Sequence, residues 1–117
     1  MNYTFNNEIP IYLQIVEIIT KDISSGILKP STKLPSVREY ALLLKANPNT
    51  VSRALFILEE KKLIYTDRTN GKYVTSDLKI IKKYRKDIFV KKVDSFLDDL
   101  KMMGYTKEEI LNKIMEL

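Results

Sequence analysis

Short polar side chains at the start of a predicted helix are the groups in this sequence best placed to do chemistry. Asn47 is of a residue type that caps helices. Pro48 suits the first helical position, because a backbone N–H at that position would have no partner within the helix. Amide and hydroxyl groups of this size can reach base edges or phosphates without holding a helix away from DNA. The candidates opposite the apolar stripe are Asn49, Ser52 and Arg53, with Thr50 at the border. The alternative is that they only cap the helix and face solvent.

A second helix start lies eleven residues earlier, at Ser36. Ser36 and Glu39 have the spacing of a capping box, which predicts a helix beginning at Val37. Two starts this close leave room for only about two turns of the first helix. This layout is typical of a helix-turn-helix, whose second helix enters the major groove of DNA. Arg38 is expected to point outward near the N-terminus of the first helix.

Two β-rich runs follow at residues 63–66 and 72–75, and Asn70-Gly71 between them is a strong hairpin turn signal. A two-stranded hairpin alone is marginally stable, so it is expected to pack on the helices and to be joined by a short strand near Leu34. A hairpin directly after a helix-turn-helix is a wing, and a slender basic tip suits the minor groove or adjacent phosphates. The alternative is a solvated turn. The candidate tip residues are Arg68, Thr69, Asn70, Gly71 and Lys72.

The elements that must position these groups are mostly helical. Apolar residues recur at three- and four-residue spacing from Ile11 to Ile23, which predicts a core helix behind the helix-turn-helix with no direct functional role. The sequence therefore predicts a mainly α fold with a small β-wing (α+β). A winged helix-turn-helix domain is expected at residues 9–76, followed by a helical tail at residues 77–117.

The tail is predicted to be a helical hairpin, because Gly104 stops one long periodic pattern and Thr106 and Glu109 form a capping box for a short last helix. About 40 residues are too few for a core of their own. The apolar stripe must pack on the winged domain or on another chain, and a two-fold dimer would present two reading helices to a near-palindromic site. The predicted dimerisation residues are Ile81, Tyr84, Ile88, Val93, Phe96, Leu97, Leu100, Ile110 and Ile114.

Composition narrows the function further. The 117-residue chain has a net charge of +5 and a pI of about 9.3, which fits an anionic partner without proving one. It contains no cysteine and no histidine, so the usual zinc ligands and the commonest general base are missing. We therefore expect that the protein is not an enzyme and that it has no cofactor and no metal site. The absence of long apolar runs and of signal-peptide features predicts no membrane segment and a cytoplasmic location.

Several separated motifs together resemble the GntR family of bacterial winged-helix repressors. They are Ile9-Pro10-Ile11-Tyr12-Leu13-Gln14-Ile15, Ile23–Pro30, Leu34-Pro35-Ser36-Val37-Arg38-Glu39, Asn47–Ala54, Leu63-Ile64 and Gly71–Val74. The short two-helix tail is similar to that of the YtrA subfamily. This resemblance implies a homodimeric regulator of transcription that binds double-stranded DNA through a sequence-specific operator and dimerises through its tail. Genes of YtrA-like members often sit with transporter operons, which makes such an operon a candidate target.

The resemblance also assigns roles to individual residues. The Arg of the family's Pro-Ser-x-Arg motif contacts DNA, and here it is Arg38. The start of the recognition helix reads bases and phosphates, and the wing-tip glycine, here Gly71, approaches the minor groove. The recognition-helix positions that match are Asn47, Asn49, Thr50, Ser52 and Arg53.

Two residues depart from the family pattern. Ser31 and Lys45 stand where the family usually has glycine. If Lys45 is left-handed, the conformation costs on the order of 1 kcal/mol. Neither residue is expected to touch a base. A winged-helix module that binds only proteins is the alternative function, and whether a small-molecule effector exists is left open.

Overall fold

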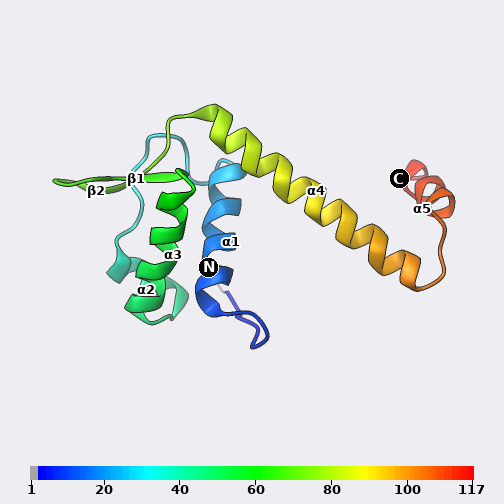
Figure 1. Cartoon of the computed structure of the whole chain (residues 1–117), viewed down its shortest axis with the longest axis horizontal. Coiled ribbons are helices and arrows are strands. Elements are labelled where there is room, and N and C mark those ends of the chain that lie inside the picture. The colour runs from blue at the N-terminus through cyan, green and yellow to red at the C-terminus, as the bar shows by residue number, and fades with distance from the viewer. Residues whose placement is uncertain (1–2) are drawn as a thin grey trace. The chain divides into compact units, whose positions relative to one another are not determined.

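The computed structural model describes residues 3–117 and confirms a mainly α fold with a small β-wing. Figure 1 shows the order of the elements along the chain. They are α1 (Ile11–Ser24), α2 (Val37–Leu44), α3 (Pro48–Glu60), β1 (Ile64–Asp67), β2 (Gly71–Val74), α4 (Leu78–Met102) and α5 (Lys107–Met115). The chain forms two compact units, the first ending at Arg85 and the second spanning Lys86–Leu117.

Both predicted helix starts of the helix-turn-helix are confirmed. The Ser36 hydroxyl accepts the Glu39 backbone N–H at 3.1 Å, and the Glu39 carboxylate accepts the Ser36 backbone N–H at 3.1 Å. At α3, the Asn47 side-chain oxygen accepts the Asn49 N–H at 2.8 Å, and Pro48 is the first helical residue. The caps satisfy N–H groups that helix ends otherwise leave unpaired, so local chemistry fixes where α2 and α3 begin.

A single core holds α1, α3 and the wing together. Ile15 and Ile19 of α1 are fully buried, as are Val51 and Leu58 of α3 and Leu63 just before β1. Their spacing places one apolar stripe of each helix inward and leaves the other side of α3 in water. The predicted stripe of α1 is confirmed at Ile15, Ile19 and Ile23, whereas Ile18 is only partly buried and Ile11 at the first turn is exposed.

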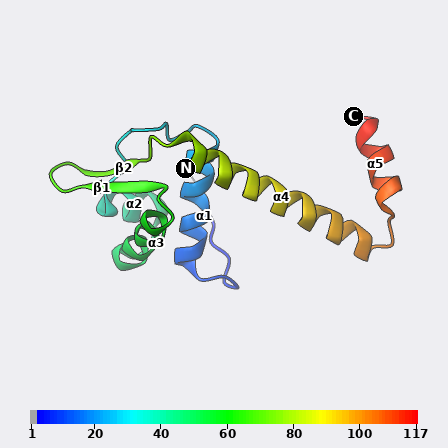
Figure 2. The ribbon, with the colours of Figure 1, turned by 45° about the horizontal axis from the view of Figure 1, so that its top comes forward.

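The two strands form an antiparallel hairpin that extends away from the helices (Figures 1 and 2). Ile64 pairs with Val74 at its base, and Asp67 pairs with Gly71 at its tip. The expected strand near Leu34 is present as a single bridge between Lys33 and Tyr73. The Leu34 N–H adds a bond to the Lys72 carbonyl at 2.8 Å. This third segment anchors the wing to the chain that leads into α2.

The two residues that stand where the family usually has glycine both have a left-handed backbone conformation. Ser31 has φ of 65°, and Lys45, the C-terminal cap of α2, has φ of 52° and ψ of 46°. An L side chain in this region crowds its own carbonyl, whereas glycine does not. The turn between α2 and α3 therefore keeps the geometry that glycine favours but carries the strain of a lysine.

Replacing Lys45 with glycine is expected to raise the free energy of unfolding by about 0.5–1 kcal/mol, because relief of strain exceeds the extra freedom of unfolded glycine. Urea unfolding followed by circular dichroism measures the change. Lys45→Ala is the matched control, since it removes the same exposed side chain but keeps a Cβ. A glycine variant no more stable than the alanine variant would show that the turn is unstrained.

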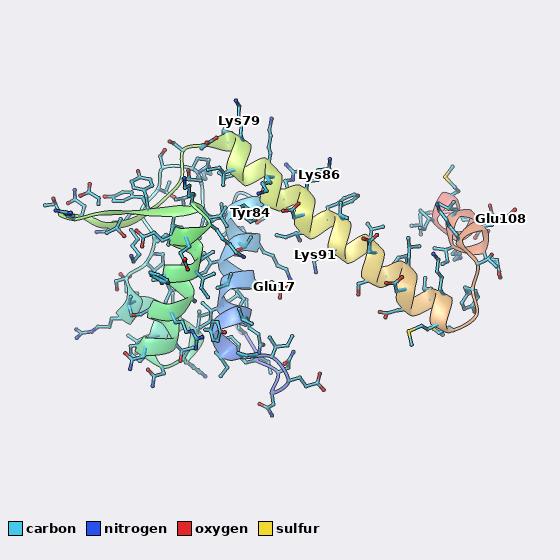
Figure 3. The ribbon with its side chains drawn as sticks, in the orientation of Figure 1. Glu17, Lys79, Tyr84, Lys86, Lys91 and Glu108 are labelled. Carbon is cyan, nitrogen blue, oxygen red and sulfur yellow. The ribbon has the colours of Figure 1, made fainter. Side chains whose placement is uncertain are left out.

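The first turns of α4 pack on the winged core. Ile81 is 8% exposed and belongs to the same buried cluster as α1 and α3, while Ile80 and Tyr84 pack against that cluster. Figure 3 shows Tyr84 on the α1 side of the helix and Lys79 pointing away from it. The sequence placed the domain boundary between residues 76 and 77, whereas the first compact unit runs through Arg85. Ile81 and Tyr84, predicted for dimerisation, therefore support the winged domain within their own chain.

The second unit contains the rest of α4 and α5. Gly104, with φ of 95°, follows the end of α4, and the Thr106–Glu109 capping box begins α5 as predicted. Ile110 of α5 is 5% exposed, but most other apolar side chains of this unit face solvent. Across residues 3–117, every helix is too short or too polar to cross a membrane.

Candidate nucleic-acid interface

The exposed side of α3 presents the polar residues that the sequence singled out. Asn49, Ser52 and Arg53 are exposed, and Thr50 is partly buried at the border. The side-chain oxygen of Asn47 accepts the capping hydrogen bond. The N–H groups of the same side chain are not used by the cap and can donate to a partner. Pro48 has no N–H, and the N–H groups of Asn49 and Val51 are bonded to Asn47, so within the first turn of α3 it is the short polar side chains that suit phosphates and base edges.

Arg38 lies at the second position of α2 and is exposed. No acidic side chain among residues 3–117 forms a salt bridge with it. Its neighbour Glu39 is occupied by the cap, and the Ser36 backbone N–H lowers the pKa of the Glu39 carboxyl. The guanidinium of Arg38 is thus free to donate to an anionic partner.

Arg53 is held by a residue that the sequence did not assign to the interface. Its guanidinium carbon lies 3.8 Å from the centre of the Tyr12 ring, a close cation–π contact between α3 and α1. Tyr12 sits in the first turn of α1, which was expected to have no functional role. A tyrosine on an amphipathic helix gives no sequence signal for a partner 41 residues away.

The wing tip is a tight turn closed by Asp67. The Thr69 N–H donates to the Asp67 carboxylate at 2.9 Å, and the Asn70 N–H donates to the Asp67 carbonyl at 3.3 Å. Gly71 follows the turn with φ of 106°, rather than forming its centre with Asn70. Arg68 and Asn70 are exposed at this tip. The tip therefore presents one cation and one amide on a narrow backbone.

Lys72 is engaged within the protein. Its ammonium lies 3.2 Å from the Glu59 carboxylate and 2.8 Å from the Thr66 hydroxyl. The Thr66 hydroxyl also donates to Glu59, and this bond together with Lys72 lowers the pKa of the Glu59 carboxyl. These bonds among Lys72, Thr66 and Glu59 connect the hairpin to α3. Lys72 thus offers a nucleic acid less free charge than Arg68 does.

Lys33 is a second residue that sequence reasoning missed. Its side chain runs along Gly71, where an added Cβ would lie 3.3 Å from the Lys33 Cε. Lys33 and Gly71 line a hollow of about 320 Å³ with Asn70, Ser36 and other residues at the start of α2. The sequence did offer one signal for Lys33: the chain before Pro35 is expected to be extended, and an extended segment there can pair with the wing. Within residues 3–117 Lys33 makes no salt bridge, so an exposed cation lies beside Gly71 near the tip of the wing.

The predicted site residues thus fall into two sets. The start of α3 and Arg38 belong to the helix-turn-helix, and Arg68, Asn70 and Gly71 belong to the wing tip. All of these lie in the first compact unit. In the described part of the chain, no three acidic side chains gather as a metal would require.

Comparison with known proteins agrees with this geometry. The model of the gntR family of bacterial regulatory proteins matches residues 11–74, which run from α1 to the end of β2. The HTH-type transcriptional repressor YtrA of Bacillus subtilis (strain 168) is 47% identical over 70 residues, covering 60% of this chain and 54% of YtrA.

Solved structures extend the match beyond the winged domain. A GntR family transcriptional regulator from Listeria monocytogenes has a TM-score of 0.87 at 38% identity, covering 97% of this chain and 99% of the other. The AraR DNA-binding domain, solved in complex with operator ORR3, has a TM-score of 0.55 at 25% identity. That match covers 64% of this chain and 93% of the AraR chain.

These relatives are transcriptional regulators rather than enzymes, and YtrA, whose subfamily the sequence resembles, is one of them. The chain belongs to the GntR family of bacterial transcriptional regulators and carries its DNA-binding winged helix-turn-helix.

Proposed function

We propose that this protein is a sequence-specific repressor that binds a near-palindromic operator as a homodimer. The observation that carries the proposal is the group of unpaired donors at the start of α3, at Arg38 and at the wing tip, all in one compact unit. Repression then follows from occupying the operator. The cytoplasm, where bacterial DNA lies, is the proposed place of action, and a transporter operon is the candidate target.

Each element has a role in the proposed complex. The start of α3 enters the major groove, where Asn49, Ser52 and Arg53 reach base edges and Thr50 reaches a phosphate. The side-chain N–H groups of Asn47 meet a phosphate at the start of the helix. Arg38 approaches from α2 and pairs with a guanine or a phosphate. The hairpin places Arg68, Asn70 and Gly71 in or beside the minor groove.

The second unit supports the dimer. Its apolar side chains cannot be buried by α5 alone: Val93 is 39% exposed and Phe96 is 49% exposed. A half-open groove of about 530 Å³ lies between the end of α4 and α5. Its lining includes Phe96, Leu100, Met103, Tyr105, Ile110 and Ile114. A second copy of this unit would cover the exposed apolar surface by two-fold symmetry. The residues proposed to meet the partner are Ile88, Val93, Phe96, Leu97, Leu100, Ile110 and Ile114.

Salt dependence separates this function from the alternative, a winged-helix module that binds only proteins. A DNA binder that neutralises about 6–10 phosphates loses affinity by about 10³- to 10⁵-fold between about 50 and 200 mM salt. Fluorescence anisotropy of a labelled duplex carrying the promoter of the protein's own gene measures this loss, with a scrambled duplex as control. We expect the protein to bind the promoter duplex more tightly than the scrambled duplex, and to lose affinity for it with rising salt by the factor given above. No binding to either duplex at about 50 mM salt would favour the protein-binding module.

A further inference from the structure

The contact between Tyr12 and Arg53 joins the recognition helix to the helix behind it. α1 and α3 pack against each other, and Tyr12 is partly buried against their shared core. The ring is thereby fixed, and the Arg53 guanidinium lies over its face at 3.8 Å. A long arginine side chain on the surface would otherwise sample many rotamers. The ring therefore restricts a side chain that the sequence places at the DNA surface.

The stacking leaves the donors of Arg53 free. A guanidinium that lies on an aromatic face is held through the electrons of the ring, while its N–H groups point outward in its own plane. Among residues 3–117 no carboxylate forms a salt bridge with Arg53. Arg53 can then remain on the ring while it donates edge-on to a base or a phosphate.

We propose that Tyr12 is a positioning residue for DNA recognition: its ring orients the Arg53 guanidinium before DNA arrives, so that α1 takes part in operator binding. The inference rests on the proposed function, because it requires that Arg53 contacts DNA. Preorganisation lowers the cost of ordering this side chain in the complex, and this gain depends on the aromatic face rather than on the tyrosine hydroxyl.

The competing interpretation is that the stack only fastens α1 to α3. In that case removal of the ring changes folding stability, and any loss of DNA affinity is independent of the residue at position 53. A positioning role makes the opposite prediction. The effect on affinity of losing the ring disappears once Arg53 itself is gone.

A double-mutant cycle on the full-length chain tests the proposal. The variants are Tyr12→Leu, Tyr12→Phe, Arg53→Ala, and Tyr12→Leu combined with Arg53→Ala. The probe is a labelled duplex selected by the wild-type protein from a random library, titrated at fixed salt and a temperature well below the unfolding midpoint of every variant. Thermal unfolding of each variant is recorded alongside, so that only the folded protein is compared.

Tyr12→Leu is expected to weaken binding by about 3- to 10-fold, and Tyr12→Phe is expected to restore it to within about twofold of wild type. In the Arg53→Ala background, Tyr12→Leu is expected to cause no further loss. Equal losses in both backgrounds, or no loss in the wild-type background, would overturn the positioning role. If Arg53→Ala binds as wild type does, the positioning role is also overturned, while DNA binding itself stands. If the wild-type protein selects no duplex, the proposed function fails first.

Discussion

Replacing Arg38 with alanine is expected to weaken operator binding by about 1–3 kcal/mol if the side chain pairs with a guanine. The side chain is exposed and is not used by the core or by the Ser36–Glu39 cap, so the fold should be unchanged. Fluorescence anisotropy at fixed salt measures the loss on the specific duplex. Circular dichroism checks that the thermal unfolding midpoint stays the same.

The control removes one positive charge elsewhere. Lys107 is exposed at the start of α5 in the second unit, so Lys107→Ala lowers the net charge equally without touching the winged domain. Arg38→Lys separates two modes of contact, because lysine keeps a phosphate contact but loses the two-donor geometry that reads guanine. Equal affinities for Arg38→Ala and Lys107→Ala would remove Arg38 from the interface.

Replacing Phe96 with aspartate is expected to separate the proposed dimer into monomers. Phe96 is about half exposed in the single chain, and dimerisation would bury it in both copies. Losing two such contacts and burying two charges should raise the dimer dissociation constant by about 100-fold or more. Sedimentation velocity measures the state of the wild type and the variant across a range of concentrations.

Ser95→Asp is the matched control for this variant. Ser95 is the neighbouring residue on α4, is exposed and gains the same charge, but it lies among the polar positions Lys91, Lys92, Asp98 and Asp99. It should stay dimeric. A Phe96→Asp protein that remains dimeric while binding DNA normally would place the dimer interface elsewhere.

Loss of the dimer should also weaken operator binding. Two linked domains bind two half-sites with a high effective concentration, which raises avidity by about 10²- to 10⁴-fold over one domain. Phe96→Asp is therefore expected to lose most of its affinity for the inverted repeat. Its affinity for an isolated half-site should match that of the wild type. Equal losses on both duplexes would point to a folding defect rather than to dimerisation.

Local chemistry made much of the winged domain predictable. Ser36 with Glu39, and Asn47 with Pro48, locate two helix starts because a cap acts within one turn of the chain. The resemblance indicated a left-handed turn at Lys45, where the family usually has glycine. The backbone of Lys45 is left-handed, so the turn keeps its shape without glycine. Each of these features depends on residues close in sequence.

The remaining features depend on residues far apart in sequence. Tyr12 meets Arg53, and Glu59 meets Lys72, only after α1, α3 and the wing have packed. The apolar periodicity of α4 continues through Ile81, so it could not show that the first turns face the protein's own core. Sequence spacing identifies which face of a helix is apolar, whereas packing decides which neighbour covers it.

The most direct test of the central claim is selection of duplexes from a random library by the full-length protein, followed by sequencing. A sequence-specific homodimer is expected to enrich an inverted repeat whose half-sites are centred about 10–10.5 base pairs, or a multiple of that, apart. The base preferences should weaken in the Arg38→Ala protein. Failure to enrich any sequence, or enrichment of one site without two-fold symmetry, would contradict the account.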